Sequence, residues 1–125
     1  MLHAGLTAGR RRRMAGEMNS HDTLARLEQT IAERRNADPA SSYVAKLNAK
    51  GPGKIAQKLG EEATETIIAA LTEDTSALVG EAADLLFHLM VLLGARDVPL
   101  AEVLAELDRR EGTSGIAEKA SRPQD

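Results

Sequence analysis

The chain has 125 residues and is expected to fold as a single domain around one core. It contains no cysteine, which excludes disulfide scaffolds and thiolate metal sites, and its 2% aromatic content argues against base-stacking binders of single strands or RNA. The net charge of −3 argues against a general nucleic-acid binder, and no unbroken apolar run of about 18 residues predicts a membrane span.

The first 20 residues differ from the rest in charge. Residues 1–16 hold four arginines and no acid, so residues 17–125 carry −7 against this +4 to give the net −3. No helical period is sustained in this stretch. We therefore expect residues 1–20 to be a disordered basic tail before a domain at 21–125. No secretory signal is present, and although the start loosely resembles a mitochondrial transit peptide, a cytoplasmic location is expected.

Apolar residues recur at helical spacing in the remaining sequence, and no segment alternates as a strand does. The expected helices span about residues 23–36, 42–50, 54–72, 76–94 and a last one from near Pro99 to before Gly112. Asp22 is expected to cap the first helix, and Gly51 lies in the turn that ends the second. Because the link at 72–76 is short, the two long helices should form an antiparallel hairpin within an all-α antiparallel bundle of four to five helices.

The helix expected at 76–94 carries ionisable side chains on an apolar face. At about 100° per residue, Glu81, Asp84 and His88 fall inside a stripe of leucines, and the opposite side is apolar too. Burying carboxylates without partners is costly, and acids at i and i+3 repel each other, so a cation must compensate. His88 is a core histidine bonded to a neighbour, a partner of Asp84 or a direct metal ligand, and the sequence leaves these three interpretations open.

The preceding helix supplies the matching acids. Lys58, Glu62 and Glu65 lie on one line at i, i+4 and i+7, with Lys54 and Glu61 beside it. The pair Glu62 and Glu65 lies about as far from the link at 72–76 as the pair Glu81 and Asp84 on the following helix. The four carboxylates therefore converge at one height if these faces of the two helices meet. Four acids in an apolar groove indicate a site for Mg²⁺ or Mn²⁺, whereas solvated or salt-bridged acids are the structural alternative.

The acid spacing and its flanks resemble a known family. Glu62-x-x-Glu65, fifteen residues, then Glu81-x-x-Asp84 resembles the metal motif of the all-α nucleoside triphosphate pyrophosphohydrolases, which include MazG and the dimeric dUTPases. Further segments resemble the phosphoribosyl-ATP pyrophosphohydrolase family within that superfamily. They are Ser42-Tyr43 with Lys46-Leu47, Lys54-Ile55, Gln57 to Ala63, Glu81 to Leu89, Arg110 to Ile116 and Glu118 to Arg122. The resemblance covers about residues 23–122, with Phe87 where the family often has tyrosine.

This resemblance implies a specific reaction. The family hydrolyses 1-(5-phosphoribosyl)-ATP to 1-(5-phosphoribosyl)-AMP and pyrophosphate with Mg²⁺, in the second step of histidine biosynthesis. The residues that match its metal ligands are Glu62, Glu65, Glu81 and Asp84. Glu61 is expected to join this site or to orient a water. A separate phosphoribosyl-AMP cyclohydrolase is the expected next enzyme, and a homo-oligomer, most simply a dimer, is expected because one chain cannot cover the helix at 76–94.

A triphosphate also needs cationic side chains. The candidates are Lys54, Lys58, Arg34, Arg35, Lys46, Lys119 and Arg122. Lys58 is favoured because it shares a helix face with Glu62. Two alternatives stay open: a house-cleaning nucleotide pyrophosphatase with the same acids, and a non-enzymatic helical oligomerisation module with salt-bridged acids. Substrate profiling separates the first alternative, and titration with a divalent metal separates the second.

Overall fold

The computed structural model describes residues 22–112 and 115–123, in which the regular structure is helical. The helices are α2 (Thr23–Arg34), α3 (Tyr43–Lys50), α4 (Pro52–Thr72), α5 (Thr75–Ala95), α6 (Leu100–Arg110) and α7 (Gly115–Ser121). The all-α prediction is confirmed, and the expected bounds of α2 to α6 lie within two residues of those observed. The tail predicted at residues 1–20 lies outside the described residues.

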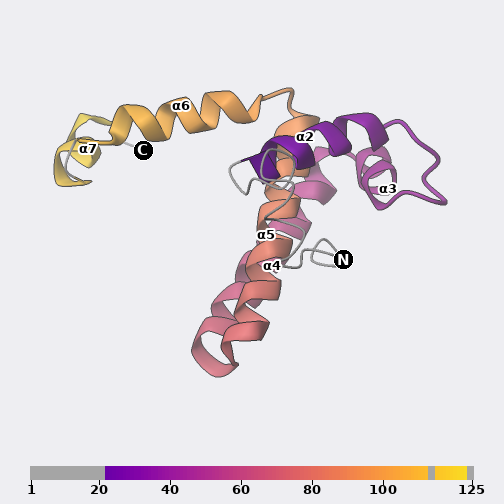
Figure 1. Cartoon of the computed structure of the whole chain (residues 1–125), viewed down its shortest axis with the longest axis horizontal. Coiled ribbons are helices and arrows are strands. Elements are labelled where there is room, and N and C mark those ends of the chain that lie inside the picture. The colour runs from indigo at the N-terminus through magenta and orange to yellow at the C-terminus, as the bar shows by residue number, and fades with distance from the viewer. Residues whose placement is uncertain (1–21, 113–114, 124–125) are drawn as a thin grey trace, which may run out of the picture.

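The two longest helices, α4 and α5, run side by side as an antiparallel hairpin, as the short link predicted (Figure 1). Asp74 caps α5, because its carboxylate accepts a hydrogen bond of 2.8 Å from the backbone N–H of Ala77. α2 and α3 pack at the end of the hairpin away from this link (Figure 1). The hairpin therefore projects from a body formed by its own open end and the two shorter helices.

Local sequence explains where these helices begin and end. Ser42 caps α3 by accepting a hydrogen bond of 3.1 Å from Ala45 N–H. α4 starts earlier than expected, at Pro52, because a proline in the first turn has no N–H to leave unpaired. Gly51 joins the two helices with φ of 92°, where other residues are strained. Asp22 occupies the N-cap position of α2 as predicted, but its side chain makes no capping hydrogen bond.

The core lies where α2 and α3 meet the open end of the hairpin. Its buried apolar side chains are Ile31, Val44, Leu47, Ile55, Met90, Val91 and Leu100. Ile55, in the first turns of α4, is fully buried, and Leu24 and Leu27 of α2 cover this cluster from outside. Leu100 brings the start of α6 into the same core, so five helices contribute to the packed body.

A left-handed residue ends α5 and redirects the chain into α6. Asp97 has φ of 57°, and the backbone N–H of Val98 reaches Leu93 O at 2.9 Å, which is the hydrogen bond of a Schellman motif. Glu28 of α2 then accepts a hydrogen bond of 2.8 Å from Leu100 N–H, at the start of α6. The Glu28 carboxylate, far away in sequence, caps the N-terminus of α6, because Pro99 before the helix makes no side-chain capping hydrogen bond.

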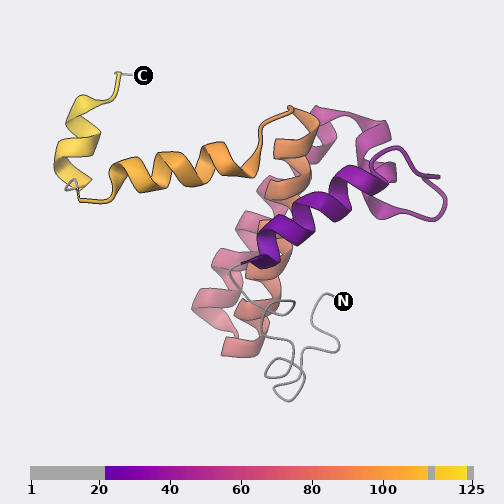
Figure 2. The ribbon, with the colours of Figure 1, turned by 45° about the horizontal axis from the view of Figure 1, so that its top comes forward.

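Beyond this anchor, α6 and α7 extend away from the body as an arm (Figure 2). Two exposed leucines, Leu104 and Leu107, lie on α6. Ion pairs within the helix stabilise it locally: Glu106 contacts Arg109 at 2.8 Å and Arg110 at 2.9 Å. The hydrogen bond from Arg109, followed by that from Arg110, lowers the pKa of Glu106 to about 2.

By length and composition, α5 would suffice to cross a membrane, with 21 residues and a mean hydropathy of 1.7. It nevertheless carries Glu81, Asp84 and His88 and packs against α2, α3 and α4. It is therefore the central helix of the bundle. Only 17% of its most apolar window is buried within one chain, which leaves much apolar surface on a core helix uncovered.

Candidate active site

Carboxylates from both helices of the hairpin converge at one level. Glu62 of α4 and Glu81 and Asp84 of α5 each offer an oxygen, and these oxygens lie within 4.8 Å of one another. Glu62 is only 8% exposed, and the other two side chains are half-buried. The convergence follows from the hairpin, since Glu62 and Asp84 are nearly equidistant from its link, and Glu81 lies one turn before Asp84 on α5.

Two oxygens of this cluster lack partners. Oε1 of Glu62 and Oε1 of Glu81 are buried and accept no hydrogen bond from any residue that the structure describes. Burial raises the pKa of Glu81, and the nearby charges of Glu65 and then Glu62 raise it further. A salt-bridged Glu81 would show the opposite pKa shift, so this residue gives no support to the salt-bridged alternative.

Glu65 and Glu61 are exposed and lie outside the group of converging oxygens. Glu65 is still close enough to the cluster to affect the pKa of Glu81 by its charge and a side-chain hydrogen bond. Glu61 accepts a hydrogen bond of 3.0 Å from Gln57 and lies 3.3 Å from the Lys58 ammonium. The hydrogen bond from Gln57, and then that from Lys58, lowers the pKa of Glu61 and keeps its carboxylate charged.

His88 is held through both ring nitrogens. Its Nδ1 lies 2.7 Å from the backbone oxygen of Asp84, which can only accept, so Nδ1 carries the proton. Nε2 is then an acceptor, and the Tyr43 hydroxyl donates to it at 2.9 Å. Of the three interpretations of His88, bonding to neighbours is thus the observed one, and the partner in Asp84 is its backbone rather than its carboxylate.

Tyr43 brings α3 to the edge of the acid cluster. Its ring stacks on Phe87 with centroids 6.0 Å apart, and its side chain is 45% exposed. Burial raises the pKa of Tyr43, the charge of Lys58 opposes this, and the charges of Glu62 and Asp84 raise it again. The phenol therefore stays neutral beside the acids.

The candidate phosphate-binding residues are spread over the molecule. Lys54 and Lys58 are half-buried on α4, on the helix that carries Glu62, and Lys46 is exposed on α3. The hydrogen bond with Glu61 raises the pKa of Lys58, which stays cationic. Arg34 is exposed at the last position of α2.

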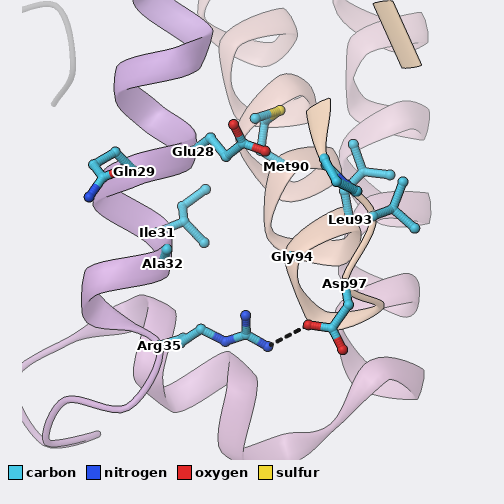
Figure 3. Close-up of a pocket in the computed structure, with 11 residues that line it drawn as sticks. Glu28, Gln29, Ile31, Ala32, Arg35, Met90, Leu93, Gly94 and Asp97 are labelled. Carbon is cyan, nitrogen blue, oxygen red and sulfur yellow. Dashed lines mark ion pairs between the residues drawn. The ribbon is translucent and has the colours of Figure 1, made fainter. Parts of the chain in front are cut away.

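Three further cations lie away from the acids. Arg35 points toward Asp97, 3.8 Å away, across a cavity of about 340 Å³ between α2 and the end of α5 (Figure 3). Lys119 on α7 and Arg122 just after it lie at the far end of the arm, which both ribbon views place away from the hairpin (Figure 2). Within one chain, Lys54 and Lys58 thus share α4 with Glu62, whereas Arg35, Lys119 and Arg122 lie on segments away from the acids.

Two residues near the acids escaped the reasoning from sequence. Tyr43 was noted only as part of a motif, and its bond to His88 spans 45 positions, which no local pattern reveals. Thr66 is not among the residues predicted from the sequence, yet its hydroxyl contacts the backbone oxygens of both Glu62 and Glu81. The sequence did contain one indication of Thr66, namely that its hydroxyl lies one helical turn after the predicted ligand Glu62.

The donor set suits a hard divalent cation. Three carboxylates supply only oxygen, and the two partnerless oxygens are the kind of buried polar atom that a cation satisfies. No thiolate is available in the sequence, and both nitrogens of His88 are engaged, which disfavours zinc. The residues therefore fit Mg²⁺ or Mn²⁺.

An all-α hairpin that brings carboxylates from both helices together, with this acid spacing, defines the class of all-α nucleoside triphosphate pyrophosphohydrolases. Comparison with known proteins narrows this class. The family model for phosphoribosyl-ATP pyrophosphohydrolase matches residues 24–111. The chain belongs to the phosphoribosyl-ATP pyrophosphohydrolase family.

Close relatives carry the corresponding name. A phosphoribosyl-ATP pyrophosphatase from Novosphingobium aromaticivorans is 76% identical over 105 residues, which cover 84% of this chain and 98% of the relative. Proteins of the same name from Rhizorhabdus wittichii and Erythrobacter litoralis are each 71% identical. The matches cover 82% and 81% of this chain and 96% and 97% of the relatives, respectively. The similarity thus extends over nearly the whole length of these enzymes.

Proposed function

We propose that this protein hydrolyses phosphoribosyl-ATP to phosphoribosyl-AMP and pyrophosphate, the second step of histidine biosynthesis, at the acid cluster of α4 and α5. The observation that carries this proposal is a group of three converging carboxylates, two of whose buried oxygens have no partner among the described residues, in a chain that is 76% identical to a phosphoribosyl-ATP pyrophosphatase. A house-cleaning nucleotide pyrophosphatase has less support, because the family model matches most of the chain.

The acids hold the cation in this proposal. Glu62, Glu81 and Asp84 are its ligands, and Glu65, whose charge already acts on Glu81, completes the set from the exposed side. A bound Mg²⁺ supplies the positive charge that an acidic groove otherwise denies to a triphosphate, and it polarises the phosphorus. Without such a cation these acids repel the substrate, so its binding depends on cation binding.

The remaining charged residues orient water and phosphate. Glu61, kept ionised by its neighbours, accepts a proton from the attacking water and directs the water oxygen at the α-phosphorus. The water oxygen bonds to the α-phosphorus, the bridging bond breaks and pyrophosphate leaves. Lys58 and Lys54 bind phosphate oxygens that the cation does not cover, and Lys46 and Arg34 border the site from α3 and α2.

We also propose that the active form is a homodimer. Apolar side chains are exposed on α4, α5 and α6, most of all Leu71 (79%), Val79 (63%) and Ile67 (59%). A second copy would cover this surface across a two-fold axis. The arm of the partner would then bring its Lys119 and Arg122, remote from the acids of their own chain, toward phosphates at the other site.

The enzyme acts in the cytoplasm in this account and passes phosphoribosyl-AMP to a separate cyclohydrolase. The test of the activity is incubation with phosphoribosyl-ATP and Mg²⁺, with pyrophosphate as the readout and deoxynucleoside triphosphates as competing substrates. Preference for phosphoribosyl-ATP is expected. A preference for deoxynucleotides would support the house-cleaning alternative instead.

A further inference from the structure

The acids on α4 and α5 carry like charges, so they repel one another across the two helices. The carboxylates of Glu62, Glu81 and Asp84 come within 4.8 Å of one another, and repulsion between them favours separation of α4 from α5 at this level. The interhelix contacts beside the acids therefore determine how well the site is formed before any cation arrives.

Thr66 makes such a contact. Its Oγ1 lies 2.8 Å from the backbone oxygen of Glu62, one turn earlier on α4, and 3.1 Å from the backbone oxygen of Glu81 on α5. The side chain is half-buried between the helices. A hydroxyl has one proton to donate, so the two carbonyl oxygens share it in a three-centre arrangement. The hydroxyl thereby links the backbone of a proposed ligand on each helix.

Other threonines of α4 show that the link across the helices is particular to Thr66. Thr64 donates to Gly60 O at 3.1 Å and Thr72 donates to Ile68 O at 2.8 Å, both within α4. Bonding to the carbonyl one turn earlier is thus shared by all three residues. Thr66 differs in facing α5, where the second acceptor belongs to Glu81.

We propose that Thr66 is a positioning residue that sets the separation between the acid of α4 and the acids of α5, and so preorganises the site for a divalent cation. This inference rests on the proposed function. Removing the hydroxyl removes none of the carboxylates, but the distance between the acid of α4 and the acids of α5 is then less tightly fixed. Cation affinity should fall, whereas the rate at saturating cation should be nearly retained, because a bound cation itself draws the acids together.

The test uses Mn²⁺ alone, titrated into the full-length protein and followed by the electron paramagnetic resonance signal of free Mn²⁺. Thr66→Val keeps the branched shape and removes the hydroxyl, and we expect its Kd for Mn²⁺ to rise about tenfold, the lower end of the effect of residues that support metal ligands. Thr66→Ser should restore the wild-type Kd. Thr64→Val is the matched control and should leave the Kd unchanged. If Thr66→Val does not fold, Thr66→Ala with Thr64→Ala replaces the pair.

Kinetics provides a readout that a general loss of stability would not move. The Mg²⁺ concentration for half-maximal turnover should rise in Thr66→Val, while kcat at saturating Mg²⁺ stays within about twofold of wild type. A wild-type Kd in Thr66→Val, equal weakening in Thr64→Val, or no rescue by Thr66→Ser would each overturn the inference. Absence of saturable Mn²⁺ binding by the wild type would instead refute the metal site itself.

Discussion

The burial of Glu81 is connected to its proposed function as a cation ligand. Its carboxylate is partly buried, one of its oxygens has no partner within the described residues, and neighbouring acids raise its pKa. Such a group weakens the metal-free fold and is useful only when a cation binds. His88, one turn after Asp84, and Tyr43 form a hydrogen bond with each other and support the edge of the site. Glu81 thus serves to bind the cation, whereas His88 and Tyr43 support the structure around it.

Replacing Glu81 with Gln should stabilise the metal-free protein in a pH-dependent manner. The folded-state pKa lies above the ordinary value of 4.5, so wild type loses stability as pH rises through the interval between the two values. The variant should therefore exceed wild type in free energy of unfolding at neutral pH, and the difference should vanish below pH 4.5. Urea denaturation in chelator at several pH values measures this.

Glu73→Gln, in the exposed link after α4, is the control for Glu81→Gln and should show no such pH-dependent gain. A Glu81→Gln protein less stable than wild type at every pH would contradict the burial argument.

Tyr43→Phe should lower the free energy of unfolding by about 1 kcal/mol, because it leaves the buried Nε2 of His88 without a donor. In a His88→Asn background, which has no group at that position, the same change should cost almost nothing. Chemical denaturation of the four proteins of this cycle gives the coupling. Equal losses in both backgrounds would show that the hydroxyl acts elsewhere.

At the level of helices, the turn between α3 and α4 is the most constrained element beside the site. Gly51 ends one helix and precedes the other with φ of 92° and ψ of 168°, a region that is nearly restricted to glycine. The turn directs α4 along α5 and holds Tyr43, at the start of α3, against His88. Sequence predicted this turn from its glycines and proline but not the contact that the turn makes possible.

Gly51→Ala should therefore destabilise the protein by about 1–3 kcal/mol. Gly53→Ala, two residues on and inside α4, should be neutral or stabilising by up to about 1 kcal/mol, because alanine favours the helix and a Cβ there meets no atom within 4 Å. Thermal unfolding of both variants measures the contrast. Equal stability of the two would show that the backbone at Gly51 relaxes freely.

For the molecule as a whole, the sequence predicted that four carboxylates converge, and the structure groups three of them, Glu62, Glu81 and Asp84. The packing of α6 was not predicted. The meeting of Glu62 with Asp84 can be predicted because their distances from the hairpin link, counted along the chain, are nearly equal. The direction of α6 could not be predicted this way, since it depends on the left-handed Asp97 and on the hydrogen bond that Glu28 accepts from Leu100 N–H, 72 positions along the chain. The arm consequently carries Lys119 away from the acids of its own chain.

The exposed leucines of this arm provide a test of assembly. Leu107 is 56% exposed on α6, and Leu107→Lys should shift the protein from dimer toward monomer by weakening the association about tenfold or more. The neighbouring, exposed Asp108→Lys should not. Sedimentation velocity at micromolar concentration measures the mass. A wild-type protein that is monomeric and fully active would contradict the proposed dimer.

The most direct test of the account is the Mg²⁺ dependence of pyrophosphate release from phosphoribosyl-ATP, compared between wild type and Glu62→Gln. The account predicts that wild-type turnover saturates with Mg²⁺ and disappears in chelator. It also predicts that Glu62→Gln, which removes the charge of the most buried acid of the cluster, loses about 100-fold or more at the same Mg²⁺ concentration. Turnover that persists in chelator, or a Glu62→Gln enzyme with near-native rates, would contradict it.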